Sequence, residues 1–281
     1  MWSLRNKIRF PLILALGLFL IGASPFAAEK KAEKPKIEKV KADKQKEKES
    51  KKEKTEKPKA KAVILFNGKD LSEWHGLSEA SQWQVAKDAK LGEKDNKRFD
   101  IVPGEGIMVN GAGGNTCNLL SDYKHGDCRL HIEFNVPVGS NSGVYFQGLY
   151  EIQVLDSYQK TDLKYGDCGG VYARHKDGQD YEGHPPLVNA SKAPGEWQSF
   201  DVVFRAPRFN EKGEKTENAK FMKVAHNGTV VHKNVEVTGP TRASLNESRQ
   251  APEAPAGPLM LQGDHGPVAY RNIKLTPLEL K

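Results

Sequence analysis

Cysteine is scarce in this sequence: only Cys117, Cys128 and Cys168 occur among its 281 residues. Because three thiols form at most one bridge within a chain, the protein is not a small scaffold held together by disulfides. A bridge between Cys117 and Cys128, which flank a possible hairpin, is one alternative, and three free thiols are the other.

Long hydrophobic runs are scarce too. The run PLILALGLFLIGA at 11–23 has 13 residues, whereas a membrane-spanning helix needs ~20. It follows three basic residues and ends before Ala27–Ala28, so residues 1–28 are predicted to be a secretory signal peptide; an uncleaved signal anchor is the alternative. We therefore expect an exported protein, either periplasmic or extracellular.

Several familiar catalytic motifs are missing. The sequence has no G-x-S-x-G, no P-loop, no C-x-x-C and no H-E-x-x-H pattern, which argues against a serine-hydrolase elbow, a nucleotide cradle and the common zinc sites. No Asp/Asn-rich loop has the spacing of a calcium loop. The sequence thus predicts no particular cofactor, and a divalent metal such as Ca²⁺ between strands stays an open alternative.

Aromatic residues are absent from residues 29–61, which carry 15 lysines and 8 acidic residues, a net charge of +7. Such a segment buries too little apolar surface to offset the entropy of ordering, so we expect a disordered linker. A passive spacer and a contact with an anionic envelope surface are its alternative roles. Residues 62–281 carry 25 basic and 28 acidic residues, a net charge of −3, which does not favour nucleic-acid binding.

Residues 62–281 lack a convincing amphipathic helix and show short alternating segments instead. These segments are 63–66, 83–85, 106–109, 128–136, 142–148, 150–156, 197–205, 221–231, 258–263 and 268–275. Asn227–Gly228 is a strong hairpin signal. Residues 206–220 and 238–258 fit no strand, and we expect surface loops there, the second one overhanging a binding face. The pattern predicts an all-β sandwich or jelly roll.

Seven short motifs follow one another along this domain. They are LFNGKDLSEWHG (65–76), NSGVYF (141–146), YEIQVLD (150–156), CGGVY (168–172), PGEW (194–197), NG (227–228) and LQGDHG with YRNI (261–273). In this order they resemble the 3-keto-disaccharide hydrolase domain family. The chain departs from the family at Gln147, where arginine is usual, and at Gln198, where asparagine is usual.

The resemblance implies a concanavalin A-like double-sheet antiparallel jelly-roll sandwich that acts on small carbohydrates. The implied substrates are 3-keto-glycosides or 3-keto-disaccharides. A ketone at C3 acidifies the C2 proton, so a base can remove it, the enolate can expel the group at C1, and water can add back. This route requires a base, a donor for the enolate oxygen and an acid at the leaving group.

The strand 150–156 carries the residues best suited to this chemistry. Glu151 and Gln153 share one face of a regular strand, while Asp156 points away. We expect a β-bulge near Val154–Leu155 that returns Asp156 to the face of Glu151. Glu151 or His265 would then be the base, with Asp156 as the acid or a metal ligand.

The remaining candidates would bind substrate. Arg271 alternates with Ile273 and Leu275 and is predicted to point inward, where it or Gln153 would donate to the enolate; a structural ion pair is the alternative for Arg271. Tyrosines at the site either stack on a sugar or pack in the core. The other expected binding residues are Asn141, Tyr145, Gln147, Tyr172 and Gln262.

Two other functions fit the same residues. One is a retaining glycosidase of laminarinase type, in which Glu151 and Asp156 act directly as nucleophile and acid. The other is a non-catalytic carbohydrate-binding module, although such a module needs aromatic and amide side chains more than a row of acids.

Overall fold

The computed structural model of this chain describes residues 61–281, which belong to one compact unit. The predicted signal peptide (1–28) and the predicted linker (29–61), apart from Lys61, lie outside these described residues. No helix within 61–281 is long and apolar enough to cross a membrane. The regular secondary structure of residues 61–281 is nearly all strand, with one five-residue helix, as the alternating pattern predicts.

The elements in chain order are β1 (Val63–Ile64), β2 (Trp74–Gly76), β3 (Gln84–Leu91), β4 (Phe99–Val109), β5 (Leu119–His125), β6 (Cys128–Asn135), β7 (Asn141–Phe146), β8 (Tyr150–Leu155), β9 (Arg174–Lys176), β10 (Gln179–Tyr181), β11 (Gln198–Arg205), β12 (Arg208–Phe209), β13 (Lys215–Glu217), β14 (Ala219–His226), β15 (Thr229–Val237), α2 (Leu245–Arg249), β16 (Gly257–Leu261) and β17 (Ala269–Pro277).

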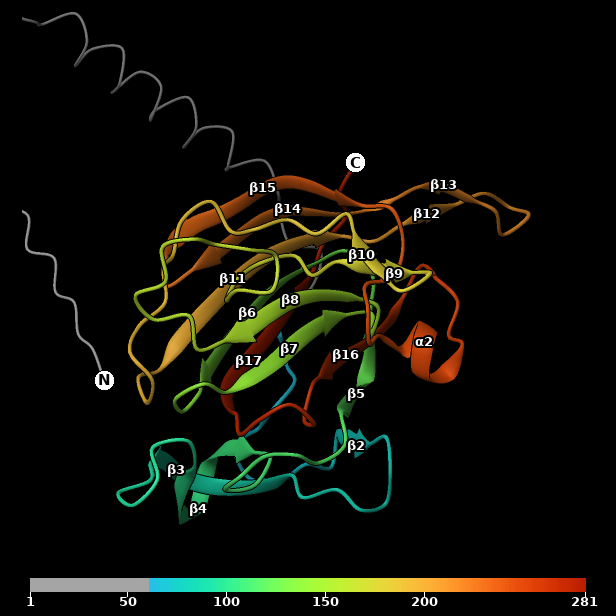
Figure 1. The fold of residues 1–281 in the computed structure, drawn as a ribbon. Coiled ribbons are helices and arrows are strands. Elements are labelled where there is room, and N and C mark those ends of the chain that lie inside the picture. The colour runs from blue at the N-terminus through green and yellow to red at the C-terminus, as the bar shows by residue number, and fades with distance from the viewer. Residues whose placement is uncertain (1–60) are drawn as a thin grey trace, which may run out of the picture. The chain divides into compact units, whose positions relative to one another are not determined.

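Two antiparallel sheets form a sandwich, as expected for a concanavalin A-like jelly roll. The larger sheet has the order β15-β14-β11-β6-β17-β4-β3, with β1 added on β17, and the smaller has the order β2-β5-β16-β7-β8. Figure 1 shows β7 and β8 in front of β6 and β17. Aromatic side chains fill the space between the sheets: the rings of Phe146 on β7 and Phe204 on β11 lie 5.0 Å apart.

Strand alternation places the core as the sequence predicts. Leu130, Ile132 and Phe134 of β6 are fully buried between the sheets, whereas the polar residues between them are more exposed on the outer face. The Asn227–Gly228 hairpin between β14 and β15 is confirmed, with φ of +50° and +80° at its two residues, the left-handed conformation that such turns require.

Other details differ from the prediction. The segment 206–220 contains the short β12–β13 pair, and 238–258 contains α2, so neither is wholly irregular. Strands β2 and β5 belong to the smaller sheet although their sequences do not alternate clearly. All three cysteines are free thiols.

Candidate functional site

The candidate site lies on the outer face of the smaller sheet, where β7 and β8 run side by side (Figure 1). Val144 of β7 pairs with Ile152 of β8, and both side chains belong to the core. The residues on either side of them therefore face outward. These outward positions pair Tyr145 with Glu151, and Gly143 with Gln153.

The absence of a side chain at Gly143 determines where the Glu151 carboxylate lies. A β-carbon on Gly143 would clash with Glu151 Oε1 and would lie 2.8 Å from Cε2 of the Tyr145 ring. The carboxylate thus lies across the sheet over Gly143, beside that ring. The glycine of the N-S-G motif is needed because any side chain at this position would occupy the space that the Glu151 carboxylate fills.

Burial changes the acidity of Glu151. The residue is 2% exposed, and this burial raises the pKa of its carboxyl from 4.5 to about 8. The nearby Tyr145 hydroxyl acts in the opposite direction, while the negative charge of Asp264 raises the Glu151 pKa further. A carboxyl with a pKa near neutrality suits proton transfer.

Two buried polar atoms beside Glu151 have no hydrogen-bond partner. They are the hydroxyl of Tyr145, close to Glu151 but not in hydrogen-bonding geometry, and Oε1 of Gln153. The other end of the Gln153 amide is occupied, because Nε2 donates to Asn141 Oδ1 at 3.0 Å. Since buried polar groups are nearly always paired, these two atoms are suited to accept or donate hydrogen bonds to a bound ligand.

The segment 168–172 extends this face beyond β8. Val171 pairs with Ile152, and the Tyr172 N–H donates to the Glu151 carbonyl at 3.1 Å. Tyr172 therefore lies beside Glu151. Partial burial, and then the Glu151 charge, raise the pKa of the Tyr172 hydroxyl, so it stays protonated and can donate a hydrogen bond.

Gln262 and His265 approach from the other side. The Gln262 N–H donates to the Gly143 carbonyl at 2.9 Å, which continues the pairing of β16 with β7. His265 is half-exposed, and its Nδ1–H donates to Asp264 at 2.6 Å. This hydrogen bond raises the pKa of His265. Because the charge of Asp264 also acts on Glu151, the Asp264–His265 pair lies at the same site.

Asp156 is placed differently from the prediction. The register between β7 and β8 is regular from Tyr150 to Leu155, so the bulge predicted near Val154–Leu155 is absent. Asp156 follows the last residue of β8, and its carboxylate accepts hydrogen bonds from the N–H groups of Gly139 at 2.9 Å and Tyr158 at 3.3 Å. It holds two turns together instead of joining the row of Glu151 and Gln153.

Gln147, predicted to bind substrate, forms hydrogen bonds within the protein instead. It occupies the turn between β7 and β8 with φ of +55°, and its Nε2 donates to the carbonyls of His125 at 3.3 Å and Pro255 at 3.2 Å. These bonds hold the turn against the segment that leads into β16.

The predicted inward orientation of Arg271 is wrong. The register of β17 against β6 shifts between Arg271 and Lys274, and Asn272 adopts φ of +52°. Both Tyr270 and Ile273 consequently face the core. Arg271 lies on the outer face of the larger sheet, where Nε donates to Glu133 at 2.7 Å and the guanidinium lies 4.0 Å from the Trp197 ring centre. The ion-pair alternative is confirmed.

Sequence reasoning missed three residues at the site. Thr241 accepts a hydrogen bond from the Glu151 N–H at 3.2 Å, Arg242 follows it, and Asp264 orients His265. Only Asp264 carried a signal, its position next to His265 in the QGDHG turn. Thr241 and Arg242 belong to a loop that only the folded chain brings to β8.

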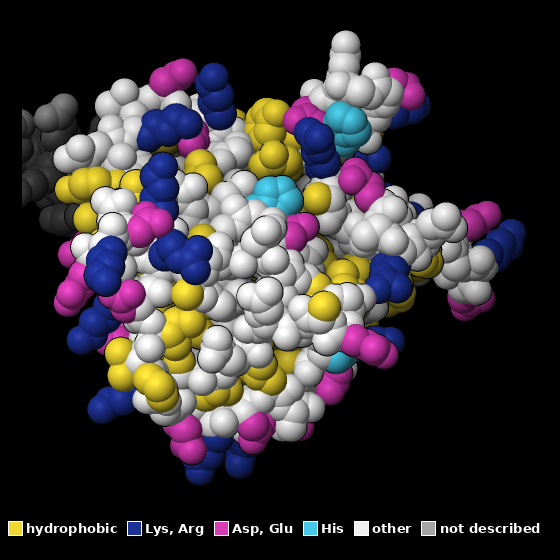
Figure 2. Space-filling view, turned by 60° about the horizontal axis from the view of Figure 1, so that its bottom comes forward, with side chains coloured by type: hydrophobic (Ala, Val, Ile, Leu, Met, Phe, Trp, Pro, Cys, Tyr) yellow, Lys and Arg dark blue, Asp and Glu magenta, His cyan; other side chains and the backbone are white. Residues whose placement is uncertain are grey.

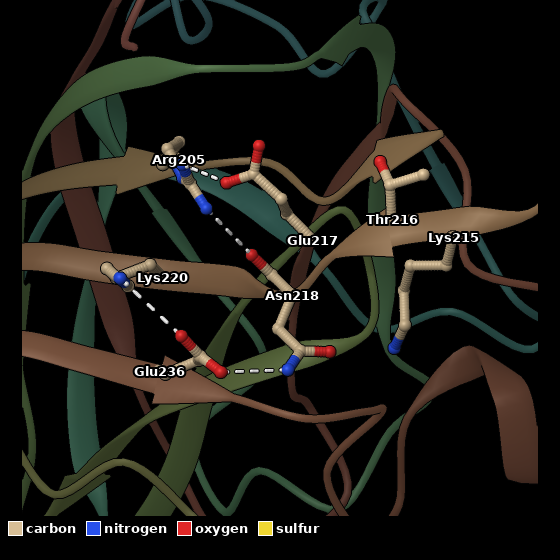
Figure 3. Close-up of a pocket in the computed structure, with 7 residues that line it drawn as sticks. All are labelled: Arg205, Lys215, Thr216, Glu217, Asn218, Lys220 and Glu236. Carbon is tan, nitrogen blue, oxygen red and sulfur yellow. Dashed lines mark hydrogen bonds and ion pairs between the residues drawn. The ribbon is translucent and has the colours of Figure 1, made fainter. Parts of the chain in front are cut away.

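A pocket of about 270 Å³ lies elsewhere, near the β12–β13 pair (Figure 3). Its charged side chains are already in ion pairs, all with one another except Lys215, which contacts Glu253 at 2.7 Å. Arg205 contacts Glu217 at 2.6 Å, and Lys220 contacts Glu236 at 3.5 Å. We therefore place the candidate site at Glu151, where a buried carboxyl has a raised pKa and lies beside unpaired polar atoms.

Figure 2 views the domain with the lower side of Figure 1 turned forward, and the lower half of this view shows mainly uncharged and hydrophobic surface, with charged side chains mainly toward its rim. Within residues 61–281, no group of three or more His, Cys, Asp and Glu side chains is arranged to hold a metal ion.

Comparison with known proteins identifies a family for the folded part of the chain. Residues 61–276 match the model of the 3-keto-alpha-glucoside-1,2-lyase-like domain. Two similar solved structures come from Parabacteroides distasonis ATCC 8503, each described as a candidate glycosyl hydrolase. One is 30% identical with a TM-score of 0.54 and covers 77% of this chain and 84% of its own. The other is 19% identical with a TM-score of 0.49 and covers 78% and 100%.

An endo-beta-1,4-glucuronan lyase from Trichoderma reesei is more distant, at 12% identity and a TM-score of 0.39, covering 76% of this chain and 96% of its own. None of the curated proteins is significantly similar to this chain.

Proposed function

Because the chain belongs to the 3-keto-alpha-glucoside-1,2-lyase-like domain family, we propose that it cleaves the glycosidic bond of a 3-keto-glycoside or 3-keto-disaccharide by elimination followed by hydration. The observation that carries the proposal is the buried carboxyl of Glu151, with a pKa of about 8, set among unpaired polar atoms. We propose further that the protein acts after export, on the basis of the signal-peptide pattern.

Glu151 is the base in this scheme. Its carboxylate takes the proton from C2 of the sugar, and the C2–H electron pair forms the enolate, with negative charge on the C3 oxygen. A carboxylate of pKa about 8 is a much stronger base than an ordinary one. About a tenth of the molecules hold it ionised at pH 7, a useful balance between availability and basicity.

His265 is the acid. The enolate re-forms the C3 ketone as a C1–C2 double bond is made and the C1–O bond breaks, and the departing oxygen needs a proton. The hydrogen bond to Asp264 favours the protonated form of His265, and its half-exposed ring can reach a leaving group. Water then adds across the double bond, with its hydroxyl on C1 and its proton on C2, so that the net reaction is hydrolysis.

The remaining residues hold the sugar. Gln153 Oε1 and the Tyr145 hydroxyl are unpaired and suited to sugar hydroxyls, and Tyr172 lies beside them. Gln262 and Asn141 complete the polar side of the same face.

The retaining-glycosidase alternative has less support. It requires a second carboxylate about 5 Å from Glu151 across the scissile bond. The predicted partner, Asp156, lies beyond the end of β8 and is already bound by two backbone N–H groups.

The proposal is tested by incubating the purified protein with a 3-keto-disaccharide and, separately, with the same disaccharide carrying the C3 alcohol. Release of sugar from the keto form alone supports elimination. Release from the alcohol alone would contradict the proposal and indicate the glycosidase, and binding without release would indicate a carbohydrate-binding module.

A further inference from the structure

The backbone of Arg242 lies beside β8, close to that of the candidate base. Arg242 donates its backbone N–H to Ala173 at 2.8 Å, one residue beyond Tyr172. The preceding residue, Thr241, donates its N–H to Leu149 at 2.9 Å and accepts the Glu151 N–H through its hydroxyl at 3.2 Å. These bonds fix residues 241–242 beside β8, at Glu151.

The guanidinium of Arg242 is anchored on one side only. Nη1 donates to both carboxylate oxygens of Asp180, each at 3.3 Å. Asp180 is itself held, because it accepts hydrogen bonds from the Tyr165 hydroxyl at 3.0 Å and from His175 at 2.6 Å. The aspartate is thus a fixed support that orients the arginine.

The rest of the guanidinium is available. The Arg242 side chain is 47% exposed, and Nη1 is its only side-chain nitrogen with a partner within residues 61–281. Arginine has five N–H donors in a planar fork, so most of them remain free to bind an oxygen atom of a ligand.

The guanidinium also lies within electrostatic reach of the site. The pKa of Tyr172 is raised mainly by burial and that of His265 mainly by its hydrogen bond to Asp264, and the positive charge of Arg242 opposes part of each increase. Tyr172 flanks Glu151 on one side, and the Asp264–His265 pair lies on the other. The charge of Arg242 therefore reaches two of the groups that surround the buried carboxyl, Tyr172 and His265.

The proposed reaction needs a donor at the C3 oxygen. Removal of the C2 proton places negative charge there, and fixed donors or cations at a developing oxyanion are among the largest contributions to catalysis. Arg271, one of the sequence-based candidates, lies on the larger sheet against Glu133. Gln153, the other, already uses Nε2 to bind Asn141.

We propose that Arg242, anchored by Asp180, binds the C3 ketone oxygen of the substrate and stabilises the enolate formed when Glu151 removes the C2 proton. This inference rests on the proposed function of the site. Arg242 would thus recognise the oxidised sugar. A C3 alcohol develops no negative charge on its oxygen, so Arg242 would stabilise it far less.

The test compares the wild-type protein with Arg242→Gln, Arg242→Lys and the control Arg249→Gln. Arg249 is the last residue of α2, the helix that follows Arg242, and donates to the Leu77 carbonyl at 2.6 Å. The readouts with a 3-keto-disaccharide are exchange of the C2 hydrogen with solvent deuterium, kcat and KM, together with the melting temperature. Arg242→Gln should slow exchange and kcat by ~10²–10³-fold, with a smaller change in KM, and Arg249→Gln should keep wild-type rates.

Arg242→Lys keeps the positive charge beside Asp180 but loses the fork, so its rates should lie between those of wild type and Arg242→Gln; this variant decides the case if Arg242→Gln does not fold. Wild-type exchange in a folded Arg242 variant would overturn the role of Arg242 alone. Absence of exchange and turnover in the wild-type protein would instead overturn the proposed function, and this role with it.

Discussion

The carboxylate of Glu151 occupies the space that a side chain at Gly143 would fill. The two residues are diagonal neighbours on β7 and β8, and Gly143 has no side chain to compete with the carboxylate for the surface of the sheet. The position of the candidate base is therefore set by a glycine on the adjacent strand.

Gly143→Ala should consequently reduce turnover without removing Glu151. The new methyl group displaces the carboxylate and crowds the Tyr145 ring, and a misplacement of about 1 Å can cost ~10²-fold in rate. The check is kcat/KM together with the melting temperature. Gly166→Ala is the control, because its methyl group would make only an ordinary contact, 3.6 Å from the Tyr172 ring. Equal activities of the two variants would contradict this account.

Glu151→Gln should stabilise the protein increasingly as the pH rises. In the folded protein Glu151 keeps its proton up to about pH 8, whereas its ordinary pKa is 4.5. Between these values unfolding releases a proton, so the Glu151 contribution to stability falls as the pH rises. Glutamine has no such proton. The unfolding free energy of Glu151→Gln minus that of the wild-type protein should grow by roughly 1 kcal/mol per pH unit between pH 5 and 7. Urea denaturation at several pH values measures this difference. A difference that does not change with pH would rule out the raised pKa of Glu151.

Arg271→Gln should affect stability and leave catalysis unchanged. Arg271 pairs with Glu133 and stacks on Trp197 at the partly exposed outer face of the larger sheet, an arrangement worth about 1 kcal/mol. Thermal unfolding and kcat/KM measured on the same preparation provide the check. A large loss of kcat/KM at an unchanged melting temperature would show that Arg271 does reach the substrate.

Asp156→Asn separates elimination from the retaining-glycosidase alternative. The asparagine oxygen can still accept the Gly139 N–H, so the turns should persist and activity should remain near wild type. If Asp156 were the acid of a carboxylate pair, its loss should cost ~10²–10⁴-fold. The two outcomes are well separated in a single comparison of kcat.

Alternation in the sequence predicted much of this site. It placed Glu151 and Gln153 on one face of a strand, and the N-S-G and C-G-G-V-Y motifs supplied Asn141, Tyr145 and Tyr172 on the neighbouring segments. Period-2 reasoning works here because one face of β8 is packed in the core, which fixes which residues face outward.

The same reasoning failed where the backbone leaves the regular pattern. Asn272 in the left-handed conformation reverses the order of inward and outward residues, so Arg271 lies outside. Asp156 lies beyond the strand end, where alternation no longer applies. Arg242 could not be found from the sequence, because its hydrogen bonds to Ala173 and Asp180, which are distant in the chain, bring it to this side of β8.

The central claim is that Glu151 removes the C2 proton of a 3-keto sugar, and exchange of that hydrogen with solvent deuterium measures this step alone. Exchange by the wild-type protein should accelerate as the pH rises toward about 8, because the base must lose its own proton. Glu151→Gln should abolish exchange, whereas His265→Asn should keep exchange and lose release of the leaving group. Exchange at the wild-type rate in Glu151→Gln would contradict the assignment of Glu151 as the base. So would loss of exchange in His265→Asn while Glu151→Gln keeps it.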